Sequence, residues 1–351
     1  MPVKILYPFI LFLFLLSDSQ AAIVPNLYDF EVDVADQSEQ GRRQGISNAM
    51  KGVLIKLTGD REIINRAAVI DIVREAERFI RQYEYRQMSV EDPENPDNPE
   101  RRLRLWVRFN KTALQSRLRD YGISQWGQER PTTLAWLVIQ DETGRNFVSQ
   151  DSYPDIIEQL NIQASQRGIQ LIYPLLDLED TLQVKTSDVW VGFNDIVILA
   201  SERYQPDAVI IGAMEKQGDD QWFARWTTNI KNQVTSWDSP VQALETALNA
   251  GVDGLADRLA QNYAQPVYQG QASSFDIVVG DIGSYERYVK VMEYLSGINS
   301  VSEVLLKSAT PDQMIFTIIS YGGGELALAQ AVELGRVMES SGVENTYRLL
   351  P

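Results

Sequence analysis

Three short apolar stretches near the middle of the chain carry its clearest pattern. Leu134–Gln140, Gln170–Leu176 and Ala208–Gly212 have the length and composition of buried strands, whereas Ser152–Gly168 and Asn194–Tyr204 repeat apolar residues at helical spacing. Strands that are apolar on both faces are typical of a sheet covered by helices on both sides. The alternation therefore predicts a central three-layer α/β domain with a mainly parallel sheet and right-handed crossovers.

The pattern continues beyond Gly212 as part of the same unit. Trp222–Trp226 and Ile230–Trp237 are predicted to form a hairpin that extends the sheet, and Val241–Tyr263 has the apolar stripe of a long amphipathic helix. The stretch that follows is rich in Gln, Ser, Gly and Pro, which is typical of a linker. The central domain is therefore expected at residues 132–264.

The segment before it predicts an N-terminal α+β domain at residues 22–125. Phe30–Val34 alternates apolar and acidic residues as a half-buried strand does, and Gln37–Leu57 and Ala67–Gln82 show helical spacing. In Leu103–Phe109 the apolar residues alternate with arginines, so this strand is expected to have a basic outer face.

An acidic run, Glu91–Glu100, interrupts the N-terminal domain and contains three prolines. Proline and net charge together disfavour both helix and strand, so the run predicts a solvated loop between two hairpin strands. The alternative is a docking or calcium-attracting loop. Calcium loops need a glycine at the sharp turn and regularly spaced aspartates, and this run has neither.

The last part of the chain, residues 274–351, predicts a C-terminal α+β domain. Its order of strand, helix, strand, strand, helix and strand is that of the ferredoxin-like split βαβ arrangement. The expected elements are Phe275–Val279, Ser284–Leu295, Val301–Lys307, Met314–Ser320, Glu325–Ser340 and Tyr347–Leu350.

Residues 1–21 have the pattern of a secretory signal peptide. Lys4 supplies a positive start, Ile5–Leu16 is apolar but short for a membrane span, and Ser19 and Ala21 are the small residues that a signal peptidase requires. We therefore expect cleavage after Ala21 and a periplasmic protein with no transmembrane segment in the mature chain. The alternative is a retained N-terminal anchor. No cysteine follows the apolar run, which excludes lipoprotein processing.

Composition removes several classes of function. The chain of 351 residues has a formal net charge of −16, which disfavours nucleic acid and anionic lipid as partners. It contains no cysteine and no histidine, so disulfides, thiolate nucleophiles, histidine bases and histidine-ligated metals are all excluded. An enzyme built from this sequence would depend on carboxylates, Lys, Ser, Thr, Tyr or an oxygen-ligated metal.

Three carboxylates form the candidate metal site. Asp177, Glu179 and Asp180 follow directly on a predicted strand, where ligands collect in open α/β sheets. Their oxygens could hold Mg²⁺ or Ca²⁺, or serve as an acid–base pair. The alternative is that one acid caps a short helix while the others face water. No catalytic or cofactor-binding residue is predicted, and no cofactor is expected.

Two further groups form a candidate binding surface. Gly322, Gly323 and Gly324 precede a predicted helix, whose first N–H groups could bind an anion, although no phosphate-binding motif is matched and a flexible turn is the alternative. The aromatic rings of Trp190, Trp222 and Trp226 could line a groove for a peptide or a carbohydrate, and packing in the core is the alternative.

Several short motifs occur in order along the chain: Phe30–Val34, Thr58–Asp60, Gln82–Tyr85, Trp126–Pro131, Trp136–Val138, Pro174–Asp180, Asp188–Trp190, Ser201–Tyr204 and Asp207–Val209. Together they resemble an uncharacterised secreted proteobacterial family, domain of unknown function 2066. The resemblance covers nearly the whole mature chain and implies no activity, substrate or catalytic residue. The middle unit is also similar to small periplasmic α/β domains of envelope-assembly proteins, which is an analogy of fold only.

Three functions remain open on the sequence. The first is a non-enzymatic interaction or assembly protein of the cell envelope, whose partner is another envelope protein or a wall polymer. The second is a carboxylate-based hydrolase, with a divalent metal at Asp177–Asp180. The third is a periplasmic protein that binds a small ligand. The absence of histidine and of any nucleophile motif favours the first.

Overall fold

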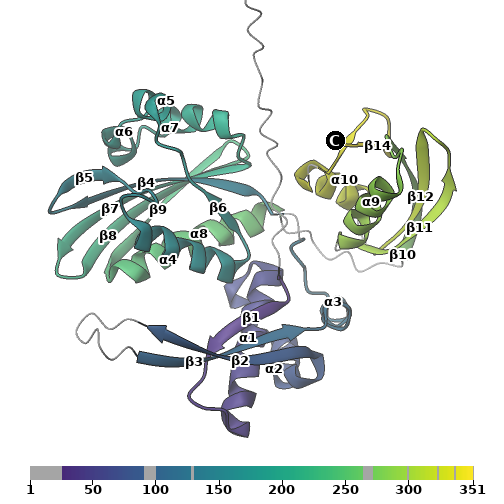
Figure 1. Cartoon of the computed structure of the whole chain (residues 1–351), viewed down its shortest axis with the longest axis horizontal. Coiled ribbons are helices and arrows are strands. Elements are labelled where there is room, and N and C mark those ends of the chain that lie inside the picture. The colour runs from purple at the N-terminus through teal and green to yellow at the C-terminus, as the bar shows by residue number, and fades with distance from the viewer. Residues whose placement is uncertain are drawn as a thin grey trace, which may run out of the picture.

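The structure is a computed structural model that describes residues 26–90, 100–127, 130–263, 272–298, 300–321, 324–335 and 337–350. These residues form a mixed α/β structure with three separate β-sheets, each with its own hydrophobic core (Figure 1). The expected signal peptide, most of the acidic run Glu91–Glu100, and Gly322 and Gly323 lie outside the described residues.

The N-terminal sheet has the strand order β1-β3-β2, and both pairs are antiparallel. Helix α1 covers one face and buries Ile46, Met50, Val53 and Leu57 in the core. The elements are β1 (Asp29–Asp33), α1 (Glu39–Thr58), η1 (Arg61–Asn65), α2 (Ala67–Arg74), η2 (Ala76–Phe79), β2 (Ile80–Val90), β3 (Glu100–Phe109) and α3 (Lys111–Asp120).

One helix expectation in this unit is wrong. The helix predicted over Ala67–Gln82 ends at Arg74, and the chain enters strand β2 at Ile80. Residues 75–82 have helix-forming composition, but β2 pairs along its whole length with β3, and that pairing overrides local propensity. The expected basic outer face of β3 is also neutralised, because Arg108 donates to both carboxylate oxygens of Asp29 on β1 at 2.7 to 3.1 Å.

The central sheet has the order β5-β4-β7-β8-β9, with the short strand β6 also paired to β4. Helices α4 and α8 cover one face and α5, α6 and α7 the other, which gives the expected three layers (Figure 1). The elements are β4 (Thr132–Asp141), β5 (Gly144–Phe147), α4 (Pro154–Arg167), β6 (Gln170–Ile172), α5 (Leu178–Gln183), α6 (Thr186–Val191), α7 (Asn194–Ser201), η3 (Glu202–Tyr204), β7 (Ala208–Gly218), β8 (Gln221–Ile230), β9 (Gln233–Gln242) and α8 (Leu244–Tyr263).

The expectation of a mainly parallel sheet is wrong. Only β4–β6 and β4–β7 are parallel, whereas β4–β5, β7–β8 and β8–β9 are antiparallel. The reason is the tight turns that join neighbouring strands. Lys231 and Asn232, between β8 and β9, have φ values of 50° and 62°, which is the geometry of a two-residue hairpin turn. A chain that reverses in two residues can only pair antiparallel.

The C-terminal sheet has the order β11-β12-β10-β14-β13. The helix expected over Glu325–Ser340 ends at Gly335, and Met338–Ser340 forms an additional strand that pairs with the last one. This extra reversal makes β14 parallel to β10, so the simple ferredoxin-like order is not observed. The elements are β10 (Ala272–Gly280), α9 (Tyr285–Gly297), β11 (Val301–Ala309), β12 (Gln313–Tyr321), α10 (Gly324–Gly335), β13 (Met338–Ser340) and β14 (Thr346–Leu349).

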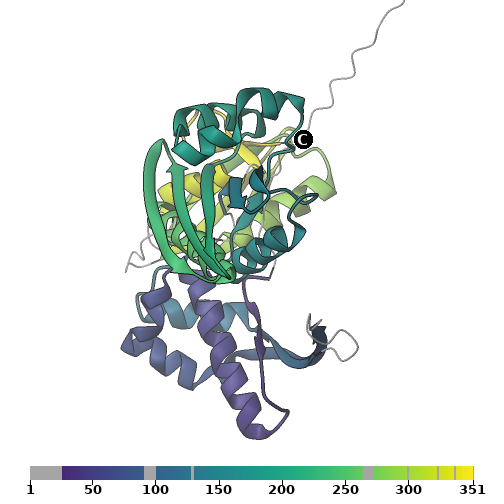
Figure 2. The ribbon, with the colours of Figure 1, turned by 90° about the vertical axis from the view of Figure 1, so that its left-hand side faces the viewer.

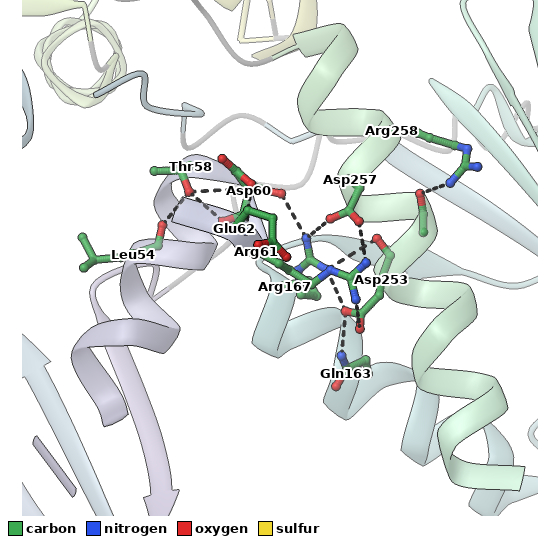
Figure 3. Close-up of polar contacts among 12 residues, drawn as sticks. Leu54, Thr58, Asp60, Arg61, Glu62, Gln163, Arg167, Asp253, Asp257 and Arg258 are labelled. Atoms are coloured by element: carbon green, nitrogen blue, oxygen red, sulfur yellow. Dashed lines mark hydrogen bonds and ion pairs between the residues drawn. The ribbon is translucent and has the colours of Figure 1, made fainter. Parts of the chain in front are cut away.

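A partly buried arginine–aspartate cluster joins the N-terminal unit to the central one, where the end of α1 meets α4 and α8 (Figures 2 and 3). Arg167, at the end of α4, donates to Asp253 at 2.7 Å, to Asp257 at 2.6 Å and to the carbonyl oxygen of Gly59 at 3.0 Å. Arg61 donates to the other oxygens of the same two aspartates, at 3.1 and 2.8 Å. Two cations and two anions therefore fix the position of α4 relative to the N-terminal sheet.

Candidate docking surface

Helices α5, α6 and α7 form a thin layer over one face of the central sheet (Figure 1). The inward side chains Val189, Val197 and Ala200, together with Val184 directly after α5, are buried against the apolar residues of β4 and β7. The three helices have only six, six and eight residues, which is too short for stable helices in isolation. Packing against the sheet therefore holds this layer in place.

The outer side of the same layer also carries large apolar side chains. Leu178 and Leu182 lie one turn apart on α5, and Ile196 and Leu199 lie one turn apart on α7, against which α5 and α6 both pack. Exposed apolar patches of this kind mark interaction sites. We call the following seven side chains, each between 42% and 75% exposed, the α5–α7 apolar surface: Leu175, Leu178, Leu182, Val191, Phe193, Ile196 and Leu199.

The predicted metal-site carboxylates connect the start of α5 to η3, the turn that follows α7. Asp177 caps α5 by accepting from the backbone N–H of Asp180 at 3.0 Å. Arg203, in η3, donates to both oxygens of Asp177 at 2.9 and 3.0 Å and to Asp180 at 2.8 Å. Tyr204 donates its hydroxyl to the buried carboxylate of Asp180 at 2.5 Å. Glu179 remains exposed, 3.7 Å from Arg203.

The carboxylates therefore surround a guanidinium. Among the residues that the structure describes, no group of three or more Asp or Glu side chains lies in an arrangement that could hold a metal ion. The alternative from the sequence was that one of the acids caps a short helix, and Asp177 does so at the start of α5. The guanidinium contact could not be read from the sequence, because Arg203 lies 26 residues from Asp177.

The contacts of Arg203 and Tyr204 with the two aspartates shift the pKa values of Asp177 and Tyr204 in opposite directions. Hydrogen bonds from Arg203, helped by the backbone N–H of Asp180, lower the pKa of Asp177 to about 2. Burial, together with the hydrogen bond to Asp180, raises the pKa of Tyr204 to about 12. At neutral pH the carboxylate is thus ionised and the phenol is protonated, which are the states that the two contacts require.

This contact predicts a change of stability at acid pH. The pKa of Asp177 is about 2 in the folded protein against an ordinary value of 3.8, so its ionised form stabilises the fold above that value and loses this contribution as the pH falls toward 2. Asp177→Asn still caps α5 but has no proton to gain. In urea titrations between about pH 4 and 2, the free energy of unfolding should fall more steeply for the wild type than for this variant. Parallel curves would contradict the assignment.

The described residues of the candidate binding surface do not lie together in the structure. Trp222 and Trp226 are buried in the core between the central sheet and α8, so their rings face packed side chains and not a ligand. Trp190 is half-buried, with the guanidinium of Arg145 4.2 Å from the centre of its ring. Gly324 is the first residue of α10, with φ of +38°.

The sequence reasoning missed the α5–α7 apolar surface. The signal was present as leucines at positions 175, 178 and 182, which have helical spacing. Helices this short do not show on which side the core lies, so inward and outward apolar residues cannot be told apart from periodicity.

Comparison with known proteins corrects the family expectation. Residues 21–127 match the model of a family described as domain of unknown function DUF8605. This is a different family from domain of unknown function 2066, so the resemblance proposed from the motifs is wrong. The match ends before β4 begins at Thr132 and characterises only the N-terminal unit.

The remaining comparisons are weak. No curated protein matches the chain. One solved structure, described as a competence-damaged protein (CinA) superfamily protein from Enterobacter cloacae, is 13% identical, and the alignment covers 43% of this chain and 86% of that one. Its TM-score of 0.19 is too low to indicate a shared fold. Within the described ranges, none of the helices has the length and hydrophobicity needed to cross a bilayer.

Proposed function

We propose that this protein is a non-enzymatic binding module of the cell envelope, which docks a partner protein through the α5–α7 apolar surface. The observation that carries the proposal is the outward exposure of seven large apolar side chains between residues 175 and 199. Burying one such leucine side chain against a partner contributes about 1.5–3 kcal/mol, so a few of them suffice for a specific complex.

The charge around this surface indicates the chemistry of the partner. Residues 175–203 contain six acidic and two basic side chains, and the whole chain has a net charge of −16. A second copy of the chain, or an anionic bilayer, would set like charges against each other. The occupant that fits is a protein with an apolar patch surrounded by Lys and Arg.

The proposed location is the periplasm. It rests on the signal-peptide pattern of residues 1–21 and on the absence of cysteine. We also propose three domains, at residues 22–125, 132–264 and 274–351, because each of the three sheets has its own hydrophobic core.

The test is site-specific photocrosslinking in intact cells. A photoreactive residue at position 178 should yield one protein adduct, and Leu182→Gln together with Leu199→Gln should abolish it. Leu326 on α10, which is 60% exposed, is the matched position: Leu326→Gln should leave the adduct unchanged. The substituted side chains are exposed, so stability should change by no more than about 0.5 kcal/mol.

Two results would contradict the proposal. One is an adduct that survives the double substitution. The other is an adduct with lipid, or with a second copy of the chain, in place of a protein whose crosslinked surface is basic.

A further inference from the structure

Lys56, in the last turn of α1, carries a buried ammonium group beside the backbone of β1. The residue is 8% exposed, and its Nζ donates to the backbone oxygen of Asp29 at 3.1 Å. The carboxylate of Asp29 is bound by Arg108, and no acidic side chain among the described residues forms an ion pair with Lys56. Burial lowers the pKa of Lys56 to about 8. The nearby Asp29 carboxylate partly offsets this effect, and the ammonium lies 5.1 Å from the centre of the Phe30 ring. No carboxylate of the described residues binds the ammonium directly, so a bound anion would complete its pairing.

Lys56 lines a cleft between the N-terminal sheet and α4, with a volume of about 630 Å³. Phe30 and Trp106 contribute apolar surface from the sheet, and Ile162, which is 45% exposed, contributes it from α4. The arginine–aspartate cluster holds the end of α4 against the end of α1, so the two walls have a fixed separation (Figure 3). The cleft is therefore preorganised for a ligand.

Strand β1 presents an open edge to this cleft. It pairs with β3 on one side only, and the bonds between Phe109 and Tyr28 and between Val34 and Leu103 show which residues face β3. Backbone groups alternate in direction along an antiparallel strand, so those of residues 29, 31 and 33 point the other way. At position 29 they are occupied by Asn26 and Lys56.

The backbone N–H and C=O of Glu31 therefore point into the cleft. Glu31 lies two residues after Asp29, whose backbone oxygen binds the ammonium group of Lys56. An extended segment can bind such an edge through its own backbone. If that segment runs antiparallel to β1, its chain direction leads from position 33 toward position 29. Its C-terminal end then arrives at Lys56.

We propose that this cleft binds the C-terminal segment of a partner protein as an added antiparallel strand on β1, with its terminal carboxylate on the ammonium of Lys56. The ammonium of Lys56 supplies the charge complementarity, the open edge selects an extended backbone, and Phe30, Trp106 and Ile162 receive side chains. The site is independent of the α5–α7 apolar surface, because α4 and α5–α7 cover opposite faces of the central sheet.

The test uses the purified full-length chain and a degenerate library of hexapeptides with free C-terminal carboxylates, alongside the same library as C-terminal amides. The wild type should retain a subset of the free-carboxylate peptides and none of the amides. Lys56→Met keeps the aliphatic stem and removes the buried charge, so it should fold and bind the retained peptides about 10- to 100-fold more weakly.

Two variants at Glu31 test whether the peptide binds to the open edge of β1. Glu31→Pro removes the N–H that points into the cleft, at an edge position where proline is tolerated, and should also abolish retention. Glu31→Gln removes the carboxylate that pairs with Arg104 at 2.9 Å but keeps that N–H, so it should retain peptides that Glu31→Pro does not. Equal retention of the amides, binding unaffected by Glu31→Pro, or no retained peptide at all would overturn the proposal. Because the comparison of carboxylate with amide uses only the wild type, it stands even if a variant fails to fold.

Discussion

Replacing Arg167 with methionine should lower the free energy of unfolding by about 3–5 kcal/mol, the cost of removing one partner from a buried ion pair. The Arg167 side chain is 4% exposed, and its guanidinium binds Asp253, Asp257 and the carbonyl oxygen of Gly59. The variant leaves two partly buried carboxylates that keep the half-exposed Arg61 as their cation, while Asp253 also keeps the hydrogen bond from Gln163. The loss should be visible in urea titrations followed by tryptophan fluorescence.

The control for this prediction is Arg74→Met. Arg74 pairs with Asp71 on the surface of α2, where the two side chains are 72% and 51% exposed. Such a pair contributes about 0–1 kcal/mol. A loss below about 1 kcal/mol for Arg167→Met would mean that the cluster does not hold the two units together.

Replacing Trp226 with alanine should cost about 3–5 kcal/mol, the range for deleting a large buried aromatic. The side chain is fully buried, and its ring occupies space that two glycines leave free. A Cβ atom at Gly251 would lie 2.4 Å from that ring, and one at Gly212 would lie 2.5 Å from it. The surrounding strands and α8 cannot collapse into the resulting cavity without moving the sheet.

Tyr285→Ala provides the comparison, because Tyr285 is 78% exposed and should change stability by no more than about 0.5 kcal/mol. The same experiment tests the interpretation of Trp226 as a binding residue. A ligand-binding ring would lose partner affinity with little change in stability, whereas a core ring loses stability first.

The local patterns predicted most elements but not how they pair. Leu134–Gln140 and Ala208–Gly212 lie within the central strands β4 and β7, and Gly59 and Gly168 end α1 and α4 in the left-handed conformation that such C-caps require. The direction in which neighbouring strands pair could not be predicted in the same way, because it depends on the turns that join them. The alternation of strands and helices predicted a parallel sheet, and the hairpins β7–β8–β9 made it mixed.

In the candidate sites, too, contacts between near neighbours could be predicted from the sequence and contacts between distant residues could not. The cap at Asp177 is a contact between residues three apart, and the sequence contained it as an alternative. The guanidinium that occupies the predicted metal site comes from Arg203. In the β1–α4 cleft, the hydrogen bonds of the Asp29 carboxylate go to Arg108, and Lys56 binds only the backbone oxygen of Asp29. Neither fact is encoded by spacing, since each depends on which of several possible partners lies within hydrogen-bond distance after folding.

The sequence by itself determined the mixed α/β class, the excluded chemistries that require histidine or cysteine, and the positions of most helices and strands. These follow from composition and from periodicities of two and 3.6 residues, which are local properties. Tertiary structure decided that Trp226 is core, that α5–α7 expose leucines, and that Lys56 faces an open strand edge. These are properties of surfaces brought together from distant parts of the chain. The sequence around an apolar or charged residue does not show whether another element will bury it.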